Sequence, residues 1–165
     1  MSFSADQFRD VLRCFAAGVT VMTANRAGRI HGLTVSAFVS VSADPPLVAA
    51  VIHRDHGVHS LLEVGGASFA VNILSQEQTE LSERFAFAPE DERFDGVAWT
   101  TAETGAPILT DALAWLDCRI EDRHLAGSHV IYVARVLAGE ECRSGAGPLI
   151  YWDRAYRRIE TRDPT

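Results

Sequence analysis

A segment rich in small hydroxyl residues, GLTVSAFVSVSADPPL (32–47), is the part of the sequence best suited to bind a ligand. Four hydroxyls occupy positions where a strand core would carry Val, Ile or Phe: Thr34, Ser36, Ser40 and Ser42. Small residues leave the backbone N–H and C=O groups of a strand approachable, and each hydroxyl both donates and accepts hydrogen bonds. The segment therefore suits a flat heteroaromatic ring with polar edges, or a phosphate. The residues alone are equally consistent with a polar strand edge that ends at the double proline.

A histidine-rich loop follows the next apolar run. His53, His56 and His59 are spaced three apart, which on a helix would place them on one face, and imidazole is a ligand for zinc, copper and iron. Gly57 interrupts the segment and the usual carboxylate spacing is absent, so an exposed loop is favoured over a metal site. Arg54 could bind a phosphate or carboxylate, because a guanidinium contacts two anionic oxygens at once, or it could be an ordinary surface arginine.

His129 opens a predicted strand directly after the tight turn 126–128. A histidine at the mouth of a barrel can stack on a planar ligand or hydrogen-bond to it. On the residues alone, a strand-edge histidine without a special role is the favoured interpretation. The sequence contains no GxGxxG, GxxxxGK[ST] or GxSxG motif, so it gives no support to a Rossmann dinucleotide site, a P-loop or the simplest hydrolase.

The composition indicates one globular domain over residues 1–165, with 47% hydrophobic residues to build a core. A net charge of −7 argues against nucleic acid or an anionic membrane surface as the main partner. The three cysteines are widely spaced, so neither a disulfide framework nor a cysteine zinc site is expected. No apolar run approaches the roughly 18 residues that span a bilayer, and the first ten residues do not form a signal peptide. We expect a soluble, cytoplasmic protein without a bound metal.

The elements that must position these residues are mostly strands. Helices are predicted at 5–16, where Ser4 and Gln7 form a capping box, at 59–65, and from Ser75 to Phe85. Strands are predicted at 19–24, 30–36, 47–53, 68–74, 113–122 and 129–139, with two short ones near the end. Cys14 and Cys118 fall on apolar faces and are predicted to fill the core. The pattern indicates a mainly β, α+β fold around a closed or half-closed antiparallel barrel.

Five blocks of the sequence occur in the order found in one known family. They are GLTVSAFVSVSADPPLVAAVIHRDHGVHSLL, FAVNILSQEQTELSERFA, RFDGVAW, LDCRIEDRHLAGSHVIYVARV and PLIYWDRAYRRI. Together they resemble the flavin reductase family with the FMN-binding split barrel, the small reductase components of two-component flavin-dependent monooxygenases. The resemblance runs from about Phe8 to Ile159, nearly the whole chain.

The resemblance implies a homodimeric Greek-key split β-barrel that binds FMN or FAD at the dimer interface. Such enzymes use NADH or NADPH to reduce the flavin, which then serves an oxygenase. The segment Thr34, Val35, Ser36, Ala37 matches residues that lie along the flavin ring. The segment Ser40, Val41, Ser42 matches residues that approach the ring, ribityl chain or phosphate. Three further matches are Asn72, Phe85 and, near the nicotinamide, His129.

Two positions depart from the family pattern. The family carries a hydroxyl-rich loop after the double-proline strand, where this chain has residues 54–59 with Asp55 among them. Either Arg54 and His59 hold the phosphate, or the flavin is held less tightly. Ser128 replaces the Asp of the family's Gly-Asp-His turn. Two alternatives remain open: a flavin-binding electron carrier or sensor without pyridine-nucleotide turnover, and a haem- or metal-binding module that uses the histidine loop.

Overall fold

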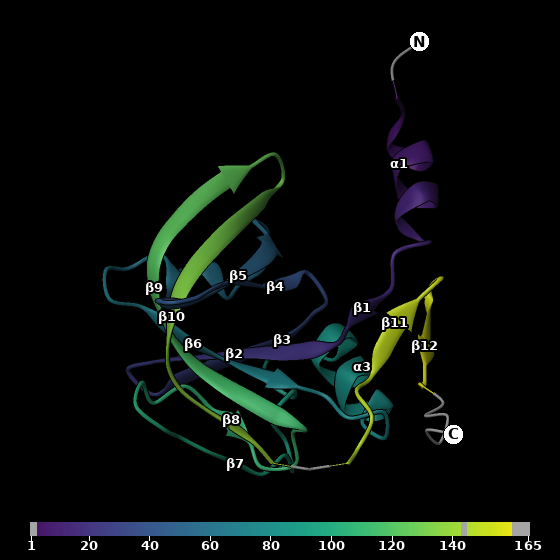
Figure 1. Cartoon of the computed structure of the whole chain (residues 1–165). Helices are drawn as coiled ribbons and strands as arrows, with labels where there is room; N and C mark the ends of the chain where they lie inside the picture. Colours follow the sequence, from purple (N-terminus) through teal and green to yellow (C-terminus); the bar gives the residue numbers. More distant parts are fainter. Residues whose placement is uncertain (1–2, 143–144, 160–165) are drawn as a thin grey trace.

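A computed structural model describes residues 3–142 and 145–159, and its main feature is one curled antiparallel sheet (Figure 1). Its seven strands lie in the spatial order β3-β2-β6-β9-β10-β5-β4. Their bounds are β2 Thr20–Arg26, β3 Arg29–Val35, β4 Phe38–Ala43, β5 Pro46–His53, β6 Ser68–Ile73, β9 Ala114–Ala126 and β10 His129–Glu141. The prediction of a mainly β, antiparallel fold is confirmed.

Two smaller sheets and three helices complete the described chain. The short strands are β1 Ala17–Gly18, β11 Ile150–Trp152 and β12 Ala155–Arg157 in one sheet, and β7 Trp99–Thr100 and β8 Ile108–Leu109 in the other. The helices are α1 Ala5–Leu12, α2 His59–Leu62 and α3 Thr79–Phe87. No helix within the described ranges is long and apolar enough to cross a membrane.

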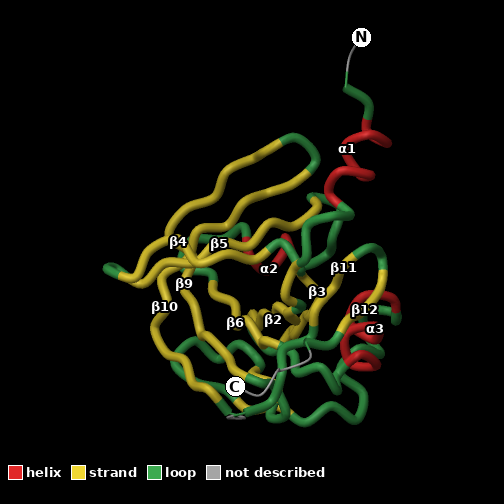
Figure 2. Tube along the Cα trace, turned by 45° about the vertical axis from the view of Figure 1, so that its right-hand side comes forward, coloured by secondary structure: helices red, strands yellow, loops and turns green. Residues whose placement is uncertain are grey.

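The two edge strands of the main sheet, β3 and β4, follow each other directly in the chain. Residues 36–37 therefore cross from one edge of the sheet to the other, and the sheet must curl to let them do so (Figure 2). The backbone N–H of Val51 in β5 donates to the carbonyl oxygen of Ala37 at 2.9 Å, which fixes this crossing. The long pair β9 and β10 bends at register shifts near Ala134 and Ala138, as bulges do.

The core lies inside the curl and is built from alternating residues of the strands. Met22, Leu33, Phe69 and Tyr132 are among its buried side chains. Each fully buried side chain of this size contributes about 1.5–3 kcal/mol. Cys118 belongs to this core as predicted, and burial, with the neighbouring Asp117 charge, raises the pKa of its thiol to about 12.

Helix α1 departs from the prediction in length and in burial. Its capping box is present, since Ser4 Oγ accepts from the Gln7 N–H at 3.1 Å and Gln7 Oε1 accepts from the Ser4 N–H at 2.9 Å. The predicted range 5–16 is too long, because the helix ends at Leu12. The prediction that Cys14 fills the core is also wrong: Cys14 is exposed, and no residue of α1 is buried. The helix stands apart from the sheet (Figure 1), so its apolar face has no partner within the described chain.

Helix α3 starts later than its sequence pattern indicates. Ser75 was the expected N-cap, but the helix begins at Thr79 and continues to Phe87. Half of the expected capping contact exists, because the Ser75 N–H donates to Gln78 Oε1 at 2.9 Å. The Ser75 hydroxyl, however, meets no hydrogen-bond partner among the described residues. The segment 75–78 therefore forms a turn that leads into the helix.

The packing against β3 leaves almost no room for a side chain at Gly32. A methyl group at this position would lie 2.7 Å from Phe85 Cδ1 and 3.1 Å from Phe94 Cζ. We predict that Gly32→Ala lowers the free energy of unfolding by about 1–3 kcal/mol, the usual cost of overpacking a core. Gly65→Ala is the control, since nothing lies within 4 Å of that position. Urea denaturation measures both, and equal stability of the two variants would contradict the prediction.

Candidate functional site

The end of β3 and the crossing that follows it lie between two clefts. One cleft, of about 210 Å³, is lined by Thr34, Val35, Ser36 and Ala37 together with residues of β5, the loop after it and β10. The other, of about 160 Å³, shares Thr34 and Ser36 and extends toward α3 and the β11–β12 hairpin. Ser36 and Ala37 are exposed, so their backbone and the Ser36 hydroxyl are open to a ligand. The structure thus brings the four predicted ring-binding residues to one place.

The hydroxyl of Thr34 has a defined donor role already. It donates to the carbonyl oxygen of Ser82 in α3 at 2.6 Å, which ties the strand to the helix. A hydroxyl that has given its hydrogen can still accept a bond. Toward a ligand, the Thr34 hydroxyl can therefore only accept a hydrogen bond, whereas the Ser36 hydroxyl can still donate one.

Histidines form one wall of the first cleft. His129 in β10 pairs in register with His53 at the end of β5, and their rings meet edge to face with centroids 5.0 Å apart. His56 also lines this cleft, with its ring centroid 6.4 Å from that of His53. The Ser128 hydroxyl lies 3.0 Å from His129 Nδ1. His129 is thus placed as predicted at the cleft, and His53 and His56 join it.

Aromatic side chains line the second cleft. Phe87, the last residue of α3, has 82% of its surface exposed and faces this cleft with Tyr151 and Tyr156. The Tyr156 hydroxyl lies 2.8 Å from Ser82 Oγ, which fixes the hairpin against α3. An exposed phenyl ring beside a polar strand end is a surface on which a planar ring can stack. Phe87, Tyr151 and Tyr156 are not among the residues predicted for the site. For Phe87 a signal existed in the sequence, because residues two apart on a helix, such as Phe85 and Phe87, lie on different faces.

The structure places Asn72 and Phe85 in the core and not at either cleft. The Asn72 amide donates to the carbonyl oxygen of Val21 at 3.1 Å and accepts from the Leu109 N–H at 2.8 Å. Phe85 packs edge to face on Phe94, with ring centroids 5.1 Å apart, directly behind Gly32. Phe85 therefore supports the strand that carries the site, Asn72 joins β6 to β2 and β8, and neither residue lines a cleft.

Residues Ser40, Val41 and Ser42 lie farther along β4 and line neither cleft. A register shift between Ser40 and Ser42 marks a bulge at Val41, which is exposed. These residues could contact only a part of the ligand that extends beyond the two clefts. That role stays a prediction.

His59 is buried beneath the histidine loop with both ring nitrogens engaged. Nε2 lies 2.9 Å from the carbonyl oxygen of His53, which can only accept, so Nε2 donates. Tyr132 then donates its hydroxyl proton to Nδ1 at 2.6 Å in the neutral ring. Burial raises the pKa of Tyr132 to about 12, which keeps this donor protonated. The geometry gives His59 the task of fixing His53, and it leaves no nitrogen for a phosphate.

Arg54 is exposed at the start of the loop and is not among the residues that line the cleft. Its backbone N–H donates to the carbonyl oxygen of Ser128 at 3.0 Å. This bond joins the histidine loop to the turn that carries His129. The assignment of Arg54 to a phosphate stays a prediction.

A second group of charges lies behind His56. The buried Arg93 donates from Nη1 to the carbonyl oxygen of Gly32 at 2.7 Å and from Nε to that of Ala88 at 3.0 Å. His31 Nε2 lies 3.1 Å from Glu90 Oε1, an ion-pair distance without good hydrogen-bond alignment. The contact with His31 lowers the pKa of Glu90 against an opposing effect of burial, and Arg93 lowers it further. Burial and then the Arg93 charge lower the pKa of His56.

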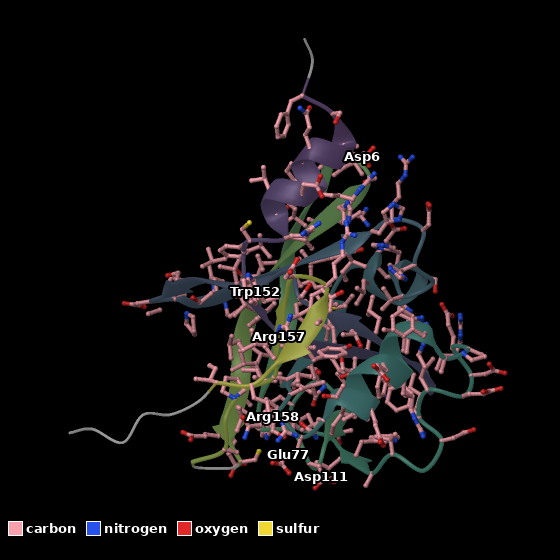
Figure 3. All side chains as sticks on the ribbon, turned by 90° about the vertical axis from the view of Figure 1, so that its right-hand side faces the viewer. Asp6, Glu77, Asp111, Trp152, Arg157 and Arg158 are labelled. Carbon is pink, nitrogen blue, oxygen red and sulfur yellow. The ribbon has the colours of Figure 1, made fainter. Side chains whose placement is uncertain are left out.

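A larger cleft lies elsewhere on the chain and has the wrong charge for a nucleotide. It measures about 500 Å³ and is lined by the carboxylates of Glu77, Glu80, Asp95 and Asp111 with one arginine, Arg84. Figure 3 shows Glu77 and Asp111 together at the end of the molecule opposite α1. Size alone would select this cleft, but carboxylates repel phosphates. Across residues 3–142 and 145–159, no group of three or more His, Cys, Asp or Glu side chains is arranged to hold a metal ion.

Comparison with known proteins places this site in a family. Residues 12–160 match the model of the flavin reductase like domain. The chain is 37% identical over 160 residues to FMN reductase (NADH) RutF of Bradyrhizobium diazoefficiens, covering 95% of this chain and 87% of that protein. It is 37% identical over 147 residues to the reductase component of 4-nitrophenol 4-monooxygenase/4-nitrocatechol 2-monooxygenase of Rhodococcus opacus, covering 88% of this chain and 76% of that protein.

A solved structure and a longer relative extend the comparison. The flavin reductase HpaC, complexed with NADP+, superposes with a TM-score of 0.86 at 33% identity, covering 94% of this chain and 98% of that one. A Rhizobium meliloti protein named probable flavin reductase is 39% identical over 150 residues. That alignment covers 90% of this chain but only 47% of the relative, so the chain spans about half of that protein.

The lowered pKa of Glu90 makes the stability of the fold depend on pH in the acidic range. A carboxylate with a folded pKa below 4.5 stabilises the fold above that pH, and this contribution is lost as the pH falls through the folded pKa. We predict that Glu90→Gln lowers the free energy of unfolding at pH 7 by less than about 1 kcal/mol, because half-exposed ion pairs are screened. The difference from the unchanged protein should shrink as the pH falls below 4.5 and through the folded pKa of Glu90.

Urea denaturation at pH 7 and pH 3.5 measures this effect. Glu92→Gln, an exposed carboxylate of the same segment, is the control. A loss of stability in Glu90→Gln that is equal at both pH values would contradict the ion-pair explanation.

Proposed function

The chain belongs to the flavin reductase like family, and we propose that the strand end Thr34–Ala37 is where it holds the flavin ring. It is an oxidoreductase that reduces FMN or FAD with NADH or NADPH. The single observation that carries the site assignment is geometric. One exposed strand end is shared by two clefts, so a flavin and a nicotinamide can meet across it.

The residues of the site fit a flavin in their chemistry. Ser36 and the adjoining backbone offer donors, Thr34 offers an acceptor, and Phe87 offers an aromatic face. A flavin held here would supply the acceptor for the hydride of a reduced nicotinamide, and that transfer would require alignment of two rings more than a strong protein base. The protein's task is then to orient both rings and to exclude alternative poses.

His129 is the residue we assign to the nicotinamide. Its ring stands at the cleft, held on one side by His53 and on Nδ1 by the Ser128 hydroxyl. Ser128 therefore supplies a neutral contact where the family carries a carboxylate. His129 stacks on the nicotinamide or donates a hydrogen bond to it, and it transfers no proton in this role.

The reduced flavin is passed to a flavin-dependent oxygenase. Support comes from the relative of Rhodococcus opacus, which is named as the reductase component of a monooxygenase. The clefts are open and shallow in the described chain, which suits a flavin that exchanges with solvent. The cytoplasm, where reduced pyridine nucleotides are made, is the location we propose, and its reducing conditions suit three free cysteines.

We also propose that the protein is a homodimer with a split barrel in each protomer. The apolar face of α1 and Phe15 just after it support this, because Phe8, Val11, Leu12 and Phe15 are 45–73% exposed. The edge strand β4 adds two exposed valines, Val39 and Val41. Exposed apolar side chains of this kind mark an interface, and a two-fold axis lets the same surface serve both copies.

The hydride-transfer assignment is tested by replacing His129. We predict that the purified chain bleaches oxidised flavin anaerobically on addition of NADH or NADPH. His129→Ala should raise KM for the nucleotide about tenfold or more, with less than a threefold change in flavin Kd, because the ring contacts the nicotinamide. His124→Ala, an exposed histidine that lines neither cleft, is the control. Equal losses in both constants would count against the assignment, and absence of bleaching would remove the reductase function.

The dimer proposal is tested by molar mass in solution. Light scattering after size exclusion should give twice the 18.0 kDa chain mass. The double substitution Leu12→Glu with Phe15→Glu should shift the protein toward monomer, because a carboxylate is costly in an apolar interface. Val64→Glu, at an exposed apolar position in the loop after α2, should leave the mass unchanged. A wild-type mass of 18.0 kDa, or a double variant that stays dimeric, would overturn this interface.

A further inference from the structure

Ser82 is a fully buried polar residue in the middle of α3, and both its backbone carbonyl and its side chain bond to other elements. Its carbonyl oxygen accepts the hydroxyl of Thr34 in β3 at 2.6 Å. Its Oγ lies 2.8 Å from the hydroxyl of Tyr156 in β12. A serine inside a helix commonly bonds to the carbonyl one turn back, so a side-chain bond to another element is a specific arrangement. One residue thus joins β3 to the β11–β12 hairpin.

The second cleft is lined by elements that meet at Ser82. Thr34 and Tyr156, the two residues bonded to it, both line this cleft, and Phe87 at the end of the same helix lines it too. Tyr151 is placed by Tyr156, because the two rings meet edge to face with centroids 5.5 Å apart. The shape of the cleft between the strand end and its aromatic side chains therefore depends on where Ser82 holds its two partners.

Strand β12, which carries Tyr156, is an edge strand of the sheet β1-β11-β12. Within the described ranges its ladder bonds go to β11, and β11 in turn pairs with β1. The Tyr156 ring packs in part against a core cluster that includes Val19, Leu74 and Leu149. Apolar packing has no direction, whereas a hydrogen bond has a preferred distance and angle. The bond between Ser82 and Tyr156 is therefore the contact that sets the place of β12 against α3 (Figures 1 and 2).

We propose that Ser82 is a positioning residue for the flavin: through its bond to Tyr156 it holds the aromatic side chains of the second cleft opposite Thr34. The proposal rests on the proposed function and adds to it a residue that acts without touching the ligand, since Ser82 lines neither cleft. Side chains that are already fixed bind a planar ring more tightly, because they lose no freedom when the ring enters. The affinity for the flavin thus depends on a bond buried behind its site.

Two substitutions remove this bond from opposite ends. Ser82→Ala deletes the serine hydroxyl but keeps the backbone carbonyl that accepts from Thr34, and Tyr156→Phe keeps the aromatic ring. Kd is measured by titration of flavin fluorescence with whichever of FMN and FAD the unchanged protein binds more tightly. We expect each substitution to raise this Kd by about two- to tenfold, which is the usual contribution of one hydrogen bond.

The nucleotide side of the reaction should respond much less. KM for NADH at saturating flavin should change less than about twofold, because His129, the residue we assign to the nicotinamide, lines the first cleft and not the second. This pattern is the reverse of the one expected for His129→Ala. Thr110→Val is the control, since it removes an exposed hydroxyl that donates to the Ala98 carbonyl at 3.3 Å and lines neither cleft.

The double variant Ser82→Ala with Tyr156→Phe separates positioning from stability. Tyr156→Phe alone leaves the buried Ser82 hydroxyl without this partner, which lowers the free energy of unfolding, whereas replacing both partners by apolar groups is nearly neutral. Urea denaturation should therefore show the double variant to be more stable than Tyr156→Phe. Its Kd for the flavin should nevertheless stay raised, because the bond that places the aromatic side chains is still missing.

The outcomes are distinct. A raised flavin Kd in both single variants and in the double variant, with little change in KM for NADH, supports the proposal. A Kd that returns to its original value together with the stability in the double variant overturns it, because the bond is then only structural. Unchanged Kd values in variants that circular dichroism shows to be folded, or equal increases in Kd and KM, overturn it as well. An unchanged chain that neither binds nor reduces FMN or FAD overturns the proposed function itself, and this proposal with it.

Discussion

Consecutive strands placed at opposite edges of one sheet are the constraint on which this molecule depends. β3 and β4 are separated by only residues 36–37, yet five other strands lie between them in the sheet. A flat sheet would hold its edges more than 20 Å apart at the usual spacing of about 4.8 Å between strands. The sheet must therefore curl until its edges meet. The crossing residues gain one backbone bond to Val51 and leave the rest of their polar groups open. The exposed strand end at residues 36–37, which we propose binds the flavin, is a consequence of this closure.

The same closure brings the charged groups of the site together. His53 ends β5, His129 begins β10, and the two strands pair in register, so the rings meet across the ladder. Buried hydrogen bonds from Tyr132 through His59 to the His53 carbonyl hold the loop from below. Arg93 holds β3 from the other side through the Gly32 carbonyl. The closure thus gathers His53, His56 and His129 along the cleft beside Thr34–Ala37.

Sequence patterns predicted the strands well and the helices less well. Alternation of apolar residues marked β2, β9 and β10, because a strand with one buried face repeats every two residues. A continuous apolar run marked β5, the apolar segment 68–74 marked β6, and the turn after β2 marked β3 as the second arm of a hairpin. The apolar face of α1 was also visible, but a periodic face does not say what covers it, and here nothing in the described chain does. For the site, the pattern around Thr34–Ala37 and His129 located residues that the fold brings together. It also selected Asn72 and Phe85, which lie behind the site in the core.

The sequence by itself determined the class of fold and the family, and it selected the segment Thr34–Ala37 that we propose faces the flavin, because composition, periodicity and ordered motifs are local properties of the chain. The tertiary structure decided which side chains line the clefts. Phe85 and Phe87 are nearly identical in sequence context, yet the first is buried and the second exposed, since α3 turns between them. His56 and His59 differ in the same way, because only the start of α2 passes under the loop. Such choices depend on contacts between segments distant in the sequence, which no local pattern encodes.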